Sequence, residues 1–440
     1  MAATEQIFVA ESATSNVISA VVRVFLQILQ VLMAAPSLIL LATLGLMLFH
    51  SPDGPAFVYD RLALGILVFV FFLSACVLQQ PFWIGGRVVG PLFALLLLAF
   101  SDALAQPYEP KIWSVFAAKW VVPLVLFLVA SNVFRCRIAL QQFESFALVA
   151  FVYLSLTAIF FLIGAKVFIF PRYILDEGLG IHADRARGPF LQAVANGVAI
   201  NLLGLIALDS FRRRRLRGIT GLLLVAMLPI AILATKTRAV WLSFVASIVA
   251  VTLFSSSRRL RRACVTMMIC SAVTLTAFIS FGEHHRSLGE RLEEDSPVEF
   301  RMAIYQAGWG MFVNKPFAGW GGEAMQPELS RRISDFRQEE YYFHNTCLEI
   351  LVQYGLIGIA LYLWVIVDLF RIGRMSGFEN SGQLGFLDGE FRRLWPIFLL
   401  AYLINATFVV MNYQFVNGLV FSIAGMLNGQ NQLAELHASR

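Results

Sequence analysis

The sequence predicts an all-α, polytopic membrane protein on three grounds: its composition, the length of its apolar runs and the placement of its arginines. Hydrophobic residues make up 58% of the 440 residues, only 14% are charged, and the mean hydropathy is +0.73. A water-soluble core could not bury that much apolar surface, whereas a bilayer accommodates it. We therefore expect a single integral membrane domain over residues 1–440.

Apolar runs of about 17–25 residues have the length of a spanning helix, and about twelve are present. They lie at 24–49, 60–78, 88–106, 112–131, 141–164, 190–210, 219–234, 238–254, 263–281, 346–370, 394–411 and 414–430. Pro36 is expected to kink or split the first run. The one long polar segment, 282–343, falls between the ninth and tenth runs and is expected to be a loop that covers a site.

Arginine-rich segments predict the orientation of these helices. Residues 212–217 and 258–262 form basic clusters in short loops two helices apart, and the other basic loops fall on the same side by count. The positive-inside rule then places both termini in the cytoplasm and puts 166–188, 235–237 and 282–343 on the outer face. The net charge of +6 is explained by this bias, so no nucleic-acid partner is expected. The five cysteines lack metal-ligand spacing, so no metal site is expected.

The long outer segment carries its own helical signals. Ser296 and Glu299 form a capping box with Pro297 at the first helical position, which predicts an amphipathic helix through Phe312. Glycines in 318–322 predict a sharp turn, because glycine accepts positive φ. A second short helix is predicted at 328–337.

His344 lies just before the N-terminus of the apolar helix that follows this segment. A single histidine at a helix start is more often a packing or capping residue than a catalyst. Asn345, however, is a good cap, and a helix N-terminus favours a neutral imidazole, which can accept a proton as a general base. Glu349, just over one turn further along, either orients His344 or lines the helix.

Outward-facing arginines are candidates for binding an anion. Arg238 follows Thr237 at a predicted helix start, where a bidentate donor and the helix dipole suit a phosphate, although an anchoring, snorkelling arginine is an equal alternative. Arg301 follows an acidic run, so a surface salt bridge is its alternative role. Arg185 and Arg187 form a further basic pair on the side that positive-inside disfavours.

Lys119 and Glu144 are ionisable residues inside predicted spans. Lys119 lies about two turns below the outer end of its helix and is either a functional residue or a lysine that snorkels to the surface. Glu144 lies near the cytoplasmic end of its helix and is expected to face water.

The second half of the chain, from 187 to 370, resembles the O-antigen ligase and Wzy-type polymerase superfamily. The residues that carry the resemblance are Thr235-Lys236-Thr237-Arg238-Ala239-Val240-Trp241, then Arg301 with Trp309, Pro316 and Gly319-Trp320-Gly321, then 344–358 beginning His344-Asn345-Thr346-Cys347-Leu348-Glu349. The first five predicted helices agree with that family only in hydropathy.

The resemblance implies a GT-C-like, metal-independent, inverting glycosyltransferase of the bacterial inner membrane, without a cofactor and with a periplasmic site. Its donor would be a glycan on undecaprenyl pyrophosphate. Arg238 and Arg301 would bind the pyrophosphate, and His344 would activate the acceptor hydroxyl. Arg185, Arg187, Asn345, Lys119 and Glu349 would be further substrate-binding residues.

Members of this superfamily differ in their acceptor. An O-antigen ligase transfers the glycan to lipid A–core and serves lipopolysaccharide biosynthesis, and this is the reading we favour. A polymerase of O-antigen or exopolysaccharide biosynthesis transfers it to another lipid-linked repeat unit and is the alternative. A polysaccharide or lipid transporter is the rival from another class, but the sequence shows no inverted repeat and few ionisable residues at mid-membrane depth.

Overall fold

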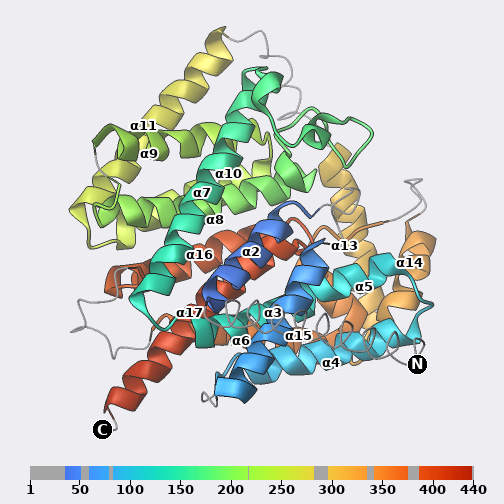
Figure 1. The fold of residues 1–440 in the computed structure, drawn as a ribbon. Coiled ribbons are helices and arrows are strands. Elements are labelled where there is room, and N and C mark those ends of the chain that lie inside the picture. Colours follow the sequence, from blue (N-terminus) through green and yellow to red (C-terminus); the bar gives the residue numbers. More distant parts are fainter. Residues whose placement is uncertain are drawn as a thin grey trace, which may run out of the picture.

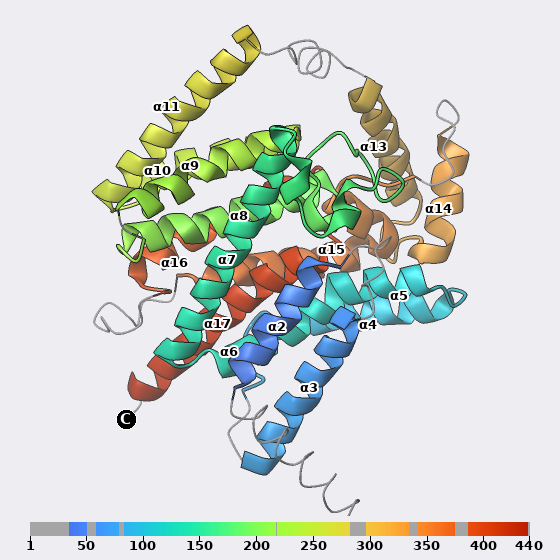
Figure 2. The same ribbon diagram turned by 45° about the horizontal axis from the view of Figure 1, so that its top comes forward.

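The computed structural model describes residues 35–50, 59–78, 83–216, 218–281, 296–333, 341–374 and 386–438. Every regular element in these ranges is a helix, and the helices pack side by side into one bundle (Figures 1 and 2). The predicted all-helical fold is therefore confirmed.

The helices that build the bundle follow the apolar runs of the sequence. In chain order they are α2 (Pro36–Leu48), α3 (Tyr59–Leu78), α4 (Val89–Ala105), α5 (Pro110–Phe116), η1 (Ala117–Val121), α6 (Val122–Val133), α7 (Arg137–Leu162), η2 (Lys166–Phe168), η3 (Arg172–Leu175), η4 (Gly188–Phe190), α8 (Ala193–Arg212), α9 (Gly218–Ala234), α10 (Arg238–Phe254), α11 (Arg258–Phe281), α13 (Ser296–Asn314), α14 (Gly321–Arg332), α15 (Thr346–Ile372), α16 (Gly389–Ala406) and α17 (Gln414–Ala438).

Five helical segments are long and apolar enough to cross a bilayer. These are Tyr59–Val77, Pro110–Val133, Arg137–Leu162, Ala193–Arg212 and Thr346–Ile372. Shorter apolar helices lie at Pro36–Leu48, Val89–Ala105, Gly218–Ala234 and Arg238–Phe254. Each predicted run overlaps a helix, so a helical membrane protein is supported, while twelve spans remain a prediction. Of the first predicted run, the structure describes only the part from residue 35 onward.

Helix α8 is almost wholly enclosed by other helices, and 94% of the residues in its most apolar stretch are buried. Small residues bring further helices close together. A Cβ on Gly425 of α17 would meet the Phe127 carbonyl oxygen of α6 at 2.3 Å, and one on Gly429 would meet the Ser131 carbonyl oxygen at 2.3 Å. Such close backbone approach is the usual way that helices associate where no hydrophobic effect drives them together.

The segments that were predicted to share one face lie together at one end of the bundle, which we call the site end. It carries 166–190, 235–237, α13, α14 and the start of α15 (Figure 2). The Ala186 amide donates to the Ala234 carbonyl (3.2 Å), and the Tyr305 hydroxyl of α13 donates to Thr407 (3.4 Å), between α16 and α17. The opposite end carries the α8–α9 and α10–α11 connections.

Helix α15 is broken, although the sequence predicts a continuous helix. Gly355 has φ 63° and ψ −157°, which interrupts the ladder of helical hydrogen bonds. The segment 316–320 fills the break: the Leu356 amide donates to Pro316 (2.8 Å), and the Trp320 amide donates to Val352 (2.9 Å). A Cβ on Gly355 would lie 2.2 Å from the Phe317 carbonyl oxygen, so only glycine fits there.

The predicted loop elements are partly right. Helix α13 ends at Asn314, close to the predicted end, and the predicted sharp turn is present, with Gly319 and Gly321 at positive φ. The second loop helix begins at Gly321, seven residues before the predicted start at 328, because the turn leads directly into it. The parts of this loop at 282–295 and 334–340 lie outside the described residues.

Candidate active site

His344 is held at the start of α15 by its neighbours on both sides. The Phe343 side chain is buried, and the Asn345 side chain accepts a hydrogen bond from the Leu348 amide (3.1 Å), which caps the helix. His344 itself is half-buried and has φ 49°. Asn345, predicted to bind substrate, therefore uses its side-chain oxygen as the helix cap.

Arg301 lies close enough to His344 to affect its titration. Burial lowers the pKa of His344 below its ordinary value, and the positive charge of Arg301 lowers it further. The shift favours the neutral imidazole that the sequence predicted, although burial and Arg301, rather than the helix terminus, are its causes. A neutral imidazole can accept a proton.

Helix α13 is pressed against the start of α15, and this contact fixes the position of Arg301. A Cβ on Gly308 would lie 2.8 Å from the Phe343 ring and 3.3 Å from Leu348. Arg301 stands seven residues, or two helical turns, before Gly308 on the same face of α13. Glu299 forms no ion pair with Arg301 within the described residues, and the other members of the acidic run lie outside them.

Lys119 and Glu349, predicted separately, form an ion pair at 2.7 Å. Their side chains are 10% and 14% exposed. Lys119 lies in η1, a π-helical turn inside the span 110–133, and such turns often mark functional sites. Because its ammonium group bonds Glu349 in the first turn of α15, Lys119 does not snorkel to the surface.

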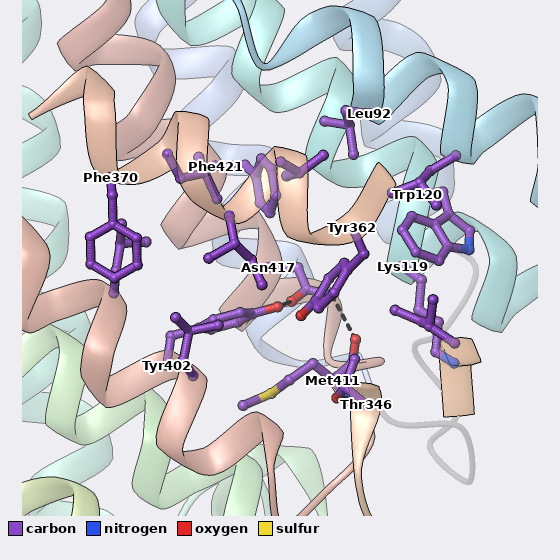
Figure 3. Close-up of a pocket in the computed structure, with 17 residues that line it drawn as sticks. Leu92, Lys119, Trp120, Thr346, Tyr362, Phe370, Tyr402, Met411, Asn417 and Phe421 are labelled. Carbon is purple, nitrogen blue, oxygen red and sulfur yellow. Dashed lines mark hydrogen bonds between the residues drawn. The ribbon is translucent and has the colours of Figure 1, made fainter. Parts of the chain in front are cut away.

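An apolar cavity extends along α15 from the ion pair (Figure 3). Its wall is formed by α4, η1, α15, α16 and α17, with Lys119 and Thr346 at one side and Phe370 at the other. Two polar side chains in the wall bond other protein groups: Tyr402 donates to Asn417 (2.9 Å), and Thr346 donates to the Val409 carbonyl (2.9 Å). The cavity is therefore a mainly apolar space with a charged group, Lys119, in its wall.

Arg238 is exposed at the first position of α10. Thr237 occupies the cap position, but its hydroxyl donates to the Thr235 carbonyl (2.9 Å) instead of capping the helix. Within the residues described, Arg238 has no carboxylate partner. Its guanidinium is thus available to an anion at the site end.

Arg187 and Arg185 differ from each other in their surroundings. Arg187 is 1% exposed, and its guanidinium donates to the carbonyls of Ile174, Asp176 and Leu179. These bonds hold the segment 166–190 in shape, so the side chain is directed into the protein. Arg185 is more open and lies beside Asp184, at 4.0 Å.

Sequence reasoning missed Asp102, near the end of α4. Its carboxylate accepts hydrogen bonds from the Gly322 amide at the start of α14 (2.9 Å) and from the Gln353 side chain (2.7 Å). It thereby connects α4, the outer loop and α15 just before the break at Gly355. An acidic residue inside an apolar run was the available signal, since such residues rarely lack a role.

Comparison with known families gives a match over part of the chain. Residues 221–363 match the family model described as O-antigen ligase. This range runs from α9 into α15 and contains Arg238, Arg301 and His344, while Lys119, Arg185 and Arg187 lie before it. No curated protein matches the chain. The predicted resemblance is confirmed over residues 221–363, which match the O-antigen ligase family model and lie within the all-helical bundle.

Proposed function

We propose that the protein is a membrane glycosyltransferase that moves a glycan from undecaprenyl pyrophosphate to an acceptor hydroxyl. One observation carries the proposal: Arg301 lies close to His344, which is two residues before Thr346 in the wall of the apolar cavity along α15. A lipid pyrophosphate needs this combination of apolar room and positive charge. The family match agrees with it.

The two chemically different parts of the donor bind to different parts of the site. The polyprenyl chain lies against the apolar cavity, and the pyrophosphate lies near Arg301 and Arg238, whose forked donors match phosphate oxygens. Lys119, paired with Glu349, and Arg185, beside Asp184, would offer hydrogen-bond donors to the substrate, while Asn345 and Arg187 act by holding the backbone around the site. Arg301 and Arg238 stabilise the negative charge of the leaving pyrophosphate, which is the role that a metal ion has in other transferases.

His344 acts on the acceptor. Its unprotonated nitrogen accepts the hydroxyl proton as the acceptor oxygen forms a bond to the anomeric carbon. The bond from that carbon to the pyrophosphate oxygen breaks, and undecaprenyl pyrophosphate leaves with the electron pair. Attack opposite to the leaving group inverts the anomeric centre. Glu349 neutralises Lys119 and keeps the first turn of α15 in register with the site.

The basic clusters at the opposite end support the orientation. By the positive-inside rule, this end and both termini would lie on the cytoplasmic side of a bacterial inner membrane, and the site end would face the periplasm. Lipid A–core is the proposed acceptor, which makes the protein an O-antigen ligase.

Glycan analysis tests this function in a host that lacks the gene, complemented with wild type or with His344→Ala. Complete lipid-linked glycan that fails to reach lipid A–core in the null and His344→Ala strains is the expected result. Single repeat units on the carrier, with no long chains, would instead assign a Wzy-type polymerase. Unchanged glycans in the null strain would overturn both activities and favour a transporter.

A further inference from the structure

Helix α13 is apolar on two opposite faces, although the sequence predicts an amphipathic helix. Ile304, Gly308 and Met311 are buried against α14 and the start of α15. Met302, Trp309 and Val313 lie on the outward face and are 54%, 57% and 58% exposed, with the polar Gln306 exposed between Met302 and Trp309. Large apolar side chains thus occupy the outward face as well as the buried one, and exposed apolar surface of this kind is typical of a helix that meets a membrane or another protein.

The hydrogen bonds at the broken helix place the segment after α13 beside the interior of the candidate span α15. Leu356, which bonds Pro316, lies ten residues after Thr346, or about 15 Å along α15. The 27-residue helix α15 is about 40 Å long, against a hydrocarbon core of about 30 Å. If α15 is centred in the bilayer, Leu356 and the segment beside it lie well below the lipid surface.

The backbone of this segment is compatible with that depth. Irregular backbone survives inside a membrane only where protein groups satisfy its hydrogen bonds. The break in α15 and the segment 316–320 satisfy each other through the amides of Leu356 and Trp320. The Lys315 ammonium group lies 4.1 Å from the Trp320 ring centroid, which keeps its charge against the protein.

The outward face of α13 continues the exposed apolar surface of the candidate span α15. Phe317, three residues after the end of α13, is 71% exposed, and it neighbours the exposed Leu356 and Ile357 of the candidate span α15. Figure 2 shows α13 crossing the direction of α15 rather than extending it, at the site end. A helix in this position, with Trp309 on its outward face, resembles interfacial helices that bury an apolar face among acyl chains.

We infer that α13 is a membrane-embedded helix whose outward face, formed by Met302, Trp309 and Val313, contacts lipid hydrocarbon. Arg301 is on this helix, so embedding it sets the height of the guanidinium at the bilayer surface. The site then opens sideways to lipid-borne substrates rather than only to water. This inference goes beyond the proposed reaction and does not depend on it.

Cysteine accessibility in purified protein tests the inference, with lipid nanodiscs exposing both bilayer faces to buffer. Trp309→Cys and Val313→Cys are reacted with a charged maleimide, wild type supplies the background of natural cysteines, and labelled peptides are identified by mass. Arg331→Cys, on the exposed surface of α14, is the water-facing control, and Trp364→Cys, exposed within α15, is the lipid-facing control. Both test positions should react about tenfold or more slower than Arg331→Cys, because apolar surroundings suppress the thiolate.

Rapid labelling of Trp309→Cys and Val313→Cys, at the rate of Arg331→Cys, would place the face in water and overturn the inference. Disulfide-linked dimers through Trp309→Cys would overturn it in favour of a second copy of the chain. A variant with the fold undisturbed gives a second measurement. The difference between the fluorescence of wild type and that of Trp309→Phe gives the emission of Trp309. Brominated acyl chains should quench this emission, and aqueous iodide should not. The reverse pattern would contradict lipid contact.

Discussion

The two ends of the bundle use charge in opposite ways. At the opposite end, Glu144 is 1% exposed and pairs with Arg213 and Arg215, and the fully buried Asp209 bonds Arg212 and Arg213. At the site end, Arg238 and Arg301 have no carboxylate partner among the described residues. Charges that are neutralised by each other stabilise the bundle, whereas charges that are left open can bind a substrate.

Glu144 corrects the expectation that it faces water. Its carboxylate accepts hydrogen bonds from Ser210, Arg213 and Arg215, which join α7 to the end of α8. Arg212 extends the cluster to Asp388, at the start of α16 (2.6 Å). The basic run that predicted the orientation is thus also a structural joint between three helices.

The largest expected effect tests the open charges. Arg301→Ala and Arg238→Ala should each reduce glycan transfer about 10²–10³-fold, because each removes a donor that stabilises the leaving pyrophosphate. Lysine at either position should restore little activity, since a point charge cannot reproduce the fork. Transfer is measured in membrane vesicles with a lipid-linked donor. Arg331→Ala, which breaks only an exposed pair with Glu328, is the control, and equal activity in all variants would misplace the site.

A loss of stability, rather than of activity, is expected when the paired charges at the opposite end of the bundle are removed. Glu144→Ala leaves Arg213 and Arg215 without their shared partner and should lower the free energy of unfolding by about 3–5 kcal/mol. Thermal and denaturant unfolding in detergent measure it. Glu435→Ala, at an exposed position near the end of α17, should stay within about 0.5 kcal/mol of wild type. If both variants unfold alike, the cluster does not stabilise the bundle.

A smaller effect is expected at the broken helix, where the site end relies on backbone contacts. Gly355→Ala should destabilise the protein by about 2 kcal/mol or more, because alanine resists positive φ and its Cβ meets the Phe317 carbonyl oxygen at 2.2 Å. Gly90→Ala, in α4 with open space around it, should be neutral or slightly stabilising. Equal melting of the two variants would contradict the fit of 316–320 into the break.

The smallest effect is a shift in pH dependence. Transfer should fall as pH drops through a pKa of His344 that lies below its ordinary value near 6.5, because only the neutral imidazole accepts the proton. Arg301→Gln removes a neighbouring positive charge, so the pKa should rise and the acid limb should move to higher pH. Arg301→Lys keeps the charge and should leave the limb in place. A limb that moves to lower pH in Arg301→Gln would show the opposite sign.

Local sequence pattern determined the helices and the candidates at their ends. An apolar run of spanning length leaves few alternatives to a helix, and a residue such as Asn345 caps its helix through neighbours only three positions away. The short motifs in the second half of the chain were also sufficient to indicate the family that residues 221–363 match.

Only the tertiary structure decided how distant groups meet. Lys119 and Glu349 are 230 positions apart, and hydropathy places each in a helix without saying which side chains face each other. The break at Gly355 depends on a segment that arrives from the outer loop, and Arg187 turns inward because three carbonyls surround it. Periodicity reports the conformation of neighbours along the chain, whereas ion pairs, kinks and burial depend on contacts that exist only after the helices have packed.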